Sequence, residues 1–227
     1  MRIDFDMLQR RKYELKKVVK NVSFVFLLLQ FCVVFAQGGN EKRSIIIDPG
    51  HGGFDSGAIG TNGVLEKDIV LSIAEEIAAI NKKLGEPLNI YLTRYRDTLI
   101  SLSHRTRLAK TIKADLFMSL HCNHSDNPNA RGVEVYVSNE KSKYSHEATW
   151  LAYRLQKSFK AKLGFESRGV KFSSFQVLKD SNSHVPAILI ELGFLSNQDE
   201  ERFLSNDESP AHIAKAIYRS LINHIKL

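Results

Sequence analysis

The sequence predicts an α/β fold: a single domain with a mostly parallel central sheet and helices on both faces. Short apolar segments alternate along the chain with longer segments whose apolar residues recur every three or four positions. Strands and helices that alternate in this way connect as a parallel sheet covered on both sides. The chain has 227 residues, of which 43% are hydrophobic, and this is enough for one domain with a substantial core.

The first 36 residues are predicted to be an export signal peptide that precedes the domain. Six basic residues between Arg10 and Lys20 come before an apolar run from Val22 to Ala36, which is the order found in export signals. An uncleaved membrane anchor is the alternative, although this run is short for a bilayer span of roughly 20 residues. In both cases we expect an exported domain in the periplasm or cell envelope, which meets a membrane only through this leader.

Residues 37–43 are predicted to be a polar linker, and the folded domain is predicted to occupy residues 44–227. The leader holds seven of the 32 Lys and Arg side chains and three of the 25 Asp and Glu side chains, so the rest of the chain has a net charge of +3. Binding of nucleic acid through its phosphates is therefore not indicated. Cys122 is the one cysteine beyond the leader, so no intramolecular disulfide is expected in the domain.

The elements of the domain are predicted from local sequence. A buried strand over 45–48 runs into a glycine-rich loop over 49–63. A helix over 66–84 follows, since its apolar residues keep the helical interval until Gly85 and Pro87 end it. The same two patterns predict strands over 88–93, 115–120, 133–137, 175–178 and 187–191, and helices over 102–113, 146–163 and 210–225.

Three of the predicted strands end at a side chain that can bind a metal or move a proton. The first strand leads to His51, the strand over 115–120 leads to His121, and the strand over 187–191 ends in Glu191. If these strands run parallel, their ends share one edge of the sheet, which is where ligands of such sheets bind. Glu66 begins the first helix of the domain, where the helix dipole favours a carboxylate, and it is placed to reach the same edge.

Two imidazoles and one carboxylate are a ligand set of catalytic zinc, and such a site keeps a position for water. Glu191 is assigned the role of general base, because burial at the end of an apolar strand raises the pKa of a carboxyl group. Each residue also has a structural interpretation. These are a turn residue for His51, a helix-start residue for Glu66, a buried hydrogen-bonded histidine for His121 and an ion-pair partner for Glu191. The residues alone therefore do not decide whether these side chains form a metal site.

Four ordered sequence blocks make the chain similar to a known family. They are IDPGHGG at 47–53 with Asp55, Gly57, Ala58 and Gly60; LTR at 92–94 with Asp97, Leu102 and Arg105; ADLFMSLH at 114–121 with Asn123; and PAILIE at 186–191 with GFLSN at 193–197. From about Ser44 to the C-terminus, the sequence resembles the zinc-dependent N-acetylmuramoyl-L-alanine amidases of the amidase type 3 group. Four blocks in order are more specific than any one of them.

The resemblance implies a zinc enzyme. It implies His51, Glu66 and His121 as ligands of Zn²⁺ and Glu191 as the catalytic carboxylate. It also implies the substrate: peptidoglycan, cut at the amide between N-acetylmuramic acid and L-alanine during cell-wall remodelling or daughter-cell separation. We expect the enzyme to be a monomer. The alternatives are a zinc peptidase acting on another cell-envelope amide and a non-catalytic wall-binding module with the same fold.

Some members of that group carry an inhibitory helix between the strand that begins near residue 133 and a later segment near residue 168. Here the interval is 35 residues long, and the helix predicted over 146–163 takes up much of it. No self-blocking segment is therefore predicted. Cys122, His124 and His184 are expected not to bind the metal, because the family set already supplies three ligands.

Overall fold

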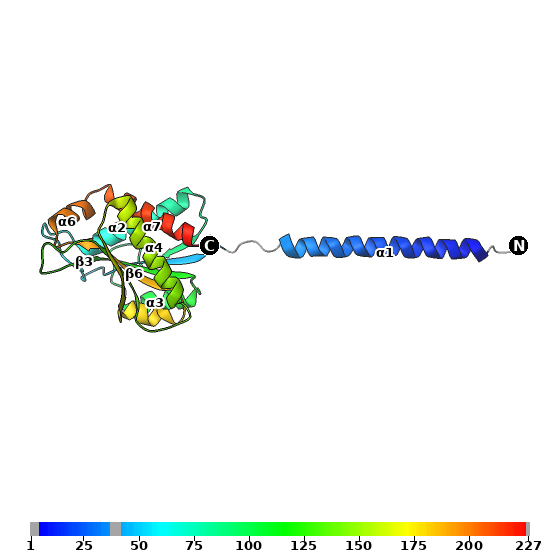
Figure 1. Ribbon diagram of the computed structural model, residues 1–227, viewed down its shortest axis with the longest axis horizontal. Helices are drawn as coiled ribbons and strands as arrows, with labels where there is room; N and C mark the ends of the chain where they lie inside the picture. Colours follow the sequence, from blue (N-terminus) through cyan, green and yellow to red (C-terminus); the bar gives the residue numbers. More distant parts are fainter. Residues whose placement is uncertain (1–4, 37–41, 226–227) are drawn as a thin grey trace. The chain divides into compact units, whose positions relative to one another are not determined.

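The computed structural model describes residues 5–36 and 42–225, which divide into two units between Glu41 and Lys42 (Figure 1). The first unit is one helix, α1 (Phe5–Ala36). Of the helices in the described ranges, none has the length and apolar character needed to cross a membrane. Most of the predicted linker, residues 37–41, lies outside the described residues.

The second unit is built on one six-stranded sheet with the order β2-β1-β3-β6-β4-β5. The strands are β1 (Ser44–Pro49), β2 (Asn89–Leu92), β3 (Leu116–Asn123), β4 (Val133–Ser138), β5 (Ser167–Ser173) and β6 (Ala187–Phe194). Strands β2, β1, β3 and β6 run parallel, while β4 pairs with β6 antiparallel and with β5 parallel. The predicted α/β fold with a mostly parallel sheet is therefore confirmed.

Helices cover both faces of this sheet. The larger layer is formed by α2 (Glu66–Lys83), α4 (Ser145–Leu163) and α7 (Ser209–Ile225), and the smaller by α3 (Leu102–Thr111) and α5 (Gln176–Asn182) (Figure 1). A short helix, α6 (Gln198–Leu204), follows β6. Successive strand residues point to opposite faces, so Ile47 packs under the larger layer and Ile46 under the smaller one. Both are fully buried, which explains the uninterrupted apolar runs.

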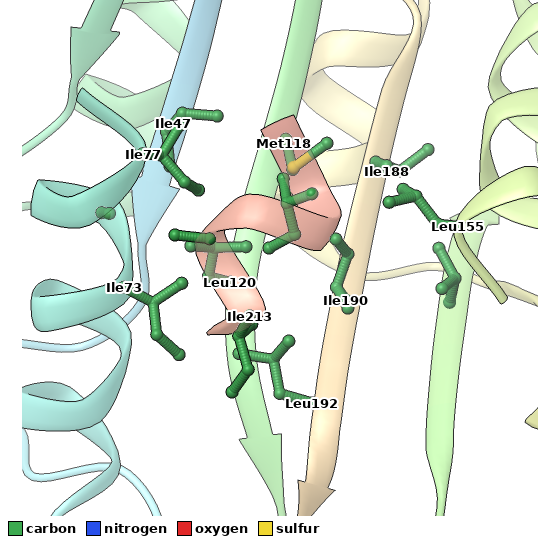
Figure 2. Close-up of a cluster of buried hydrophobic side chains, with 14 of the residues drawn as sticks. Ile47, Ile73, Ile77, Met118, Leu120, Leu155, Ile188, Ile190, Leu192 and Ile213 are labelled. Atoms are coloured by element: carbon green, nitrogen blue, oxygen red, sulfur yellow. The ribbon is translucent and has the colours of Figure 1, made fainter. Parts of the chain in front are cut away.

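Figure 2 shows the core beneath the larger layer. Strand residues from β1, β3 and β6 meet residues from α2, α4 and α7, among them Ile47, Met118, Leu120, Ile188, Ile190, Leu192, Ile73, Ile77, Leu155 and Ile213. This packing holds β1, β3 and β6 side by side at a fixed register. The residues at the carboxyl ends of these strands are therefore positioned by a rigid support.

One predicted element was wrong and two were not predicted. The strand predicted over 175–178 instead contains the N-cap and first residues of helix α5, since a mostly apolar segment of four residues does not distinguish a strand from a buried helix segment. Strand β5 was missed because it lies at the sheet edge and its sequence, SRGVKFS, is largely polar. Helix α6 was missed because it is only seven residues long, although the side chain of Asn197 caps its start.

Candidate metal centre

His51, His121 and Glu191 lie towards the same edge of the sheet, where the parallel strands β1, β3 and β6 end. His51 follows β1 by two residues, and His121 in β3 is in register with Glu191 in β6. Glu66 is the first residue of α2, and its backbone N–H donates to the carbonyl of Ala58 at 3.0 Å. The long loop before α2 thus returns to the sheet and delivers the Glu66 side chain to this edge.

The structure brings His51, Glu66 and His121 into one cluster. The Oε1 atom of Glu66 lies 2.8 Å from Nδ1 of His121 and 3.1 Å from Nε2 of His51. The two imidazole rings are edge to face, with centroids 4.9 Å apart. The three candidate ligand atoms all lie within 4.8 Å of one another, and within the described residues no other group of three His, Cys, Asp or Glu side chains comes together in this way.

Two glycines make room for this cluster. A Cβ atom at Gly50 would overlap the ring of His121, and one at Gly57 would lie 2.5 Å from Oε2 of Glu66 and 2.6 Å from Cδ2 of His51. His51 itself has a φ of 57°, a left-handed conformation that non-glycine residues seldom adopt. Strained backbone of this kind occurs at sites where the surrounding structure fixes a side chain for function.

Hydrogen bonds orient the candidate ligands. Nδ1 of His51 lies 2.9 Å from both carboxylate oxygens of Asp55, so a proton on Nδ1 leaves the Nε2 lone pair facing the cluster. The carboxylate of Glu66 accepts from the backbone N–H of Ala58 at 2.7 Å and from that of Cys122 at 2.9 Å. The sequence analysis did not single out Asp55 as a site residue, although it belongs to the first motif block.

The pKa values in the cluster are coupled. Burial favours the uncharged form of Glu66, but hydrogen bonds from His121 and His51 outweigh it and lower the pKa of this carboxyl group. Burial likewise lowers the pKa of His51, but Glu66 and Asp55 overcompensate and raise it to about 9. The pKa of His121 is also raised, because Glu66 outweighs burial. An ionised carboxylate therefore holds two imidazoles in a place suited to a divalent cation.

Glu191 differs from Glu66 in having no such partners. Its Oε2 atom is buried and makes no hydrogen bond to any described residue. Burial is the main cause that raises the pKa of Glu191 to about 7; the carboxylates of Glu66 and Glu134 add to this, while His121 opposes it. A carboxyl group with a pKa in this range exchanges a proton near neutral pH, which is what a general acid and base requires.

Two buried arginines hold the backbone that carries His51, and the sequence analysis assigned them no role. Arg105 forms an ion pair with Asp48 at 2.8 Å and donates to the carbonyl of His51 at 2.7 Å. Arg94 donates to the carbonyls of Pro49 at 3.0 Å and Gly50 at 2.8 Å. Their presence in the second motif block was the signal that could have identified them.

Glu134 on β4 lies opposite Glu191 in the register with β6 and is the centre of a charged cluster. It accepts from Nε of Arg168 at 2.5 Å, from Nζ of Lys171 at 2.6 Å and from the hydroxyl of Tyr136 at 2.6 Å. Two cations thus share one buried carboxylate beside Glu191. Arg168 and Lys171 therefore stabilise the charged form of Glu134 beside Glu191.

A cavity of about 350 Å³ opens beside His51 and His121 on the face covered by α3 and α5. Apolar side chains form much of its wall, namely Leu99, Leu102, Phe175, Val177 and Leu189. The cluster is therefore accessible from a groove that accepts a ligand of mixed polarity.

Comparisons with known proteins show the family of the chain. Residues 45–223 match the family model described as N-acetylmuramoyl-L-alanine amidase. AmiA of Escherichia coli, an N-acetylmuramoyl-L-alanine amidase, is 31% identical over 83% of this chain and 78% of its own length. LytC of Bacillus subtilis, also named as such an amidase, is 35% identical over 91% of this chain and 42% of its own length.

The fold is likewise similar to solved amidase structures. The N-acetylmuramoyl-L-alanine amidase AmiC2 of Nostoc punctiforme superposes with a TM-score of 0.75 at 33% identity, and the match covers 83% of this chain and 100% of that one. The family model matches most of the chain, and the matched range contains all four residues of the candidate site. The chain therefore belongs to the N-acetylmuramoyl-L-alanine amidase family.

Proposed function

We propose that His51, Glu66 and His121 hold a zinc ion and that Glu191 is the catalytic carboxylate for hydrolysis of the amide between N-acetylmuramic acid and L-alanine in peptidoglycan. One observation carries this proposal. A His–Glu–His cluster with its ligand atoms within 4.8 Å of one another shares the sheet edge with a buried carboxylate oxygen that has no partner among the described residues.

The donor set fits zinc in its chemistry. Two imidazole nitrogens and one carboxylate oxygen are protein ligands of catalytic zinc, and three ligands leave room for water and substrate. When bound, zinc polarises the substrate carbonyl and lowers the pKa of water. The hydrogen bond between Nδ1 of His51 and Asp55 orients the ring and makes it a better ligand.

Glu191 moves the proton in this mechanism. It takes a proton from the attacking water as the new bond to the carbonyl carbon forms. It then gives that proton to the nitrogen of L-alanine as the carbon–nitrogen bond breaks. The second proton of the water also passes to the amine, so the products are a carboxylate on the lactyl group of the sugar and an ammonium group on L-alanine, and atoms and charges balance. A carboxyl group whose pKa is raised to about 7 by burial serves both steps.

The leader supports a location outside the cytoplasm. Peptidoglycan lies beyond the cytoplasmic membrane, and a basic segment followed by an apolar run is the layout of an export signal. We infer that the domain acts as a monomer in the periplasm or cell envelope, with the leader either removed near residue 36 or kept as an anchor. Determining the amino terminus of the mature protein by mass spectrometry distinguishes these two forms.

The proposal is tested with residues 42–227, which form a compact unit with its own core. This zinc-loaded domain is incubated with purified peptidoglycan, and the products are identified by mass spectrometry. We expect new amino-terminal L-alanine with intact glycan strands. Cleavage inside the stem peptide would instead identify a peptidase, and no cleavage by the zinc-loaded domain would favour a binding module.

The same experiment tests whether the site is open without an activator. Helix α4 fills most of the interval between β4 and β5 and packs its apolar side, including Leu151 and Leu155, against the sheet. We therefore expect hydrolysis by the domain alone. Hydrolysis that appears only after a second protein is added would contradict this expectation.

A further inference from the structure

The edge of the sheet opposite the candidate metal centre contains a cavity with a volume of about 780 Å³. We propose that this cavity is a second binding site for peptidoglycan, which takes the acidic stem peptide of an uncut segment while the sugar lies on a neighbouring aromatic surface. The choice of ligand rests on the proposed function, because it assumes that the protein works on this polymer.

The position of the cavity separates it from the catalytic groups. Its wall includes Ile45 and Leu116 near the starts of β1 and β3, and Pro186 just before β6. His51, His121 and Glu191 lie towards the other ends of these same strands. A ligand in this cavity therefore does not occupy the catalytic groove. The volume suits a peptide of a few residues, since ligand pockets typically have about 300–1,000 Å³.

The cavity carries an excess of positive charge. Arg43 is paired with Asp115 at 2.6 Å, whereas Lys110, Lys113 and Lys143 form no ion pair with any residue in the described ranges. Lys113 has a φ of 52°, a left-handed conformation at the end of α3 that glycine adopts with less strain. Nζ of Lys143 lies 4.8 Å from the centroid of the Tyr144 ring, but none of the three has a carboxylate partner among the described residues. Cations of this kind around a concave surface attract the carboxylates of an acidic ligand.

A second observation comes from His224, which also lines the cavity. Its Nε2 atom lies 3.2 Å from Oε1 of Glu147, and only 11% of its side chain is exposed. Its Nδ1 atom is buried and has no hydrogen-bond partner among residues 42–225. Buried polar atoms in folded proteins almost always have a partner, so His224 is a lining residue of the cavity with an unsatisfied polar atom.

An exposed aromatic pair continues from the cavity along helix α4. Trp150, which lines the cavity, stacks on Tyr153 with ring centroids 5.7 Å apart and an angle of 26° between the rings. These side chains are 48% and 47% exposed. Nζ of Lys157 lies 5.7 Å from the Tyr153 ring. Such flat faces are negative at their centre and attract the C–H groups of a sugar ring.

The combined features favour a peptide joined to a sugar over an anionic lipid. A lipid surface is recognised by basic and aromatic side chains on an outward face. Here the cations surround a hollow that also holds the carboxylates of Asp115 and Glu147, which can accept hydrogen bonds from peptide amides. Binding at this edge would keep the domain on the polymer between catalytic events and so increase its effective concentration there.

The test measures binding without hydrolysis. Residues 42–227 carrying Glu191→Gln are sedimented with insoluble peptidoglycan, and the dissociation constant is measured. The same measurement is made on two further variants of this inactive domain, one with Lys113→Glu and Lys143→Glu and the other with Trp150→Ala. We expect at least about tenfold weaker binding from either change, since each removes groups worth on the order of 1.4 kcal/mol. Lys82→Glu together with Lys83→Glu is the matched control, because it makes the same charge change on two exposed residues outside this cavity.

Three further measurements make the result decisive. The cavity variants with Glu191 intact should hydrolyse a small soluble muropeptide at the normal rate, which shows that they are folded. Equal binding of peptidoglycan by all variants overturns the inference, even if the protein proves to be an amidase. Binding to phosphatidylglycerol vesicles that depends on the same residues, without binding to peptidoglycan, also overturns it and assigns the cavity to a lipid.

Discussion

The charged groups at the two ends of the parallel strands differ in whether they have partners. We call the side where these strands end the carboxyl edge and the side where they begin the amino edge. At the carboxyl edge, Glu66 is buried between two histidines, and every oxygen of its carboxylate is bonded. At the amino edge, Lys113 and Lys143 are exposed and have no carboxylate partner in the described part of the chain. A carboxylate whose hydrogen bonds are all satisfied is held in a fixed position, as a catalytic site requires. Cations without a carboxylate partner around a cavity remain available to a ligand.

The largest effect is expected from Glu191→Gln at the carboxyl edge. The amide keeps the shape of the side chain but does not take up a proton, so the rate of peptidoglycan hydrolysis should fall about 10²- to 10⁴-fold. Zinc content, measured by elemental analysis, should stay normal, because Glu191 is not a proposed ligand. Glu75→Gln on the exposed side of α2 is the control. Unchanged turnover in the Glu191 variant would remove this residue from the mechanism.

The next largest effect is expected on stability, from Arg105, which supports the backbone at the carboxyl edge. Arg105→Met leaves the carboxylate of Asp48 buried without its ion-pair partner and frees the carbonyl of His51. We expect the free energy of unfolding to fall by about 3–5 kcal/mol. Urea unfolding of the domain measures this. Arg107→Met on the exposed side of the same helix should change stability by less than about 0.5 kcal/mol, and a similar loss in both variants would contradict the proposed role of the ion pair.

The difference between these edges also explains what could be predicted from the sequence. The alternation of strands and helices gave the fold class, and the ends of three apolar strands pointed to His51, His121 and Glu191. Glu66 lies 15 residues after His51 in the sequence, and without the family resemblance its role stayed open. Only the fold of the intervening loop brings its carboxylate within 3.1 Å of the His51 ring.

Features that depend on packing in three dimensions were not predicted. The cavity at the amino edge joins Ile45, Leu116 and His224, which no local pattern connects. The edge strand β5 has no apolar alternation because one side of it is open. Helix α5 was mistaken for a strand because three of the four residues over 175–178 are apolar. Sequence periodicity reports burial within one element, but it does not report which elements meet.

The hydrogen bond between Asp55 and His51 gives a sharper test of the carboxyl edge. Asp55→Asn keeps the shape of the side chain but weakens the hold on Nδ1 of His51, so zinc affinity should fall by about 10- to 100-fold. Competition with a coloured zinc chelator measures the affinity. Asp126→Asn, at an exposed loop position, should leave it unchanged. Equal affinity in both variants would mean that Asp55 does not orient the ring.

The last prediction separates the two edges by pH. The pKa of His51 is raised to about 9 from an ordinary value of 6.5, so its proton stabilises the metal-free fold fully below pH 6.5, and this stabilisation is lost as the pH rises through 9. Zinc must displace that proton, and the loss of the His51 proton alone should increase zinc affinity by up to about tenfold per pH unit between pH 6.5 and 9. Calorimetry in buffers of different ionisation enthalpy counts the protons released. Peptidoglycan binding at the amino edge displaces no proton from His51, so it should not follow this curve. A zinc affinity that does not change with pH would show that no proton is displaced from His51. Peptidoglycan binding with the same pH dependence as zinc binding would mean that the polymer is held at the metal centre rather than at the amino edge.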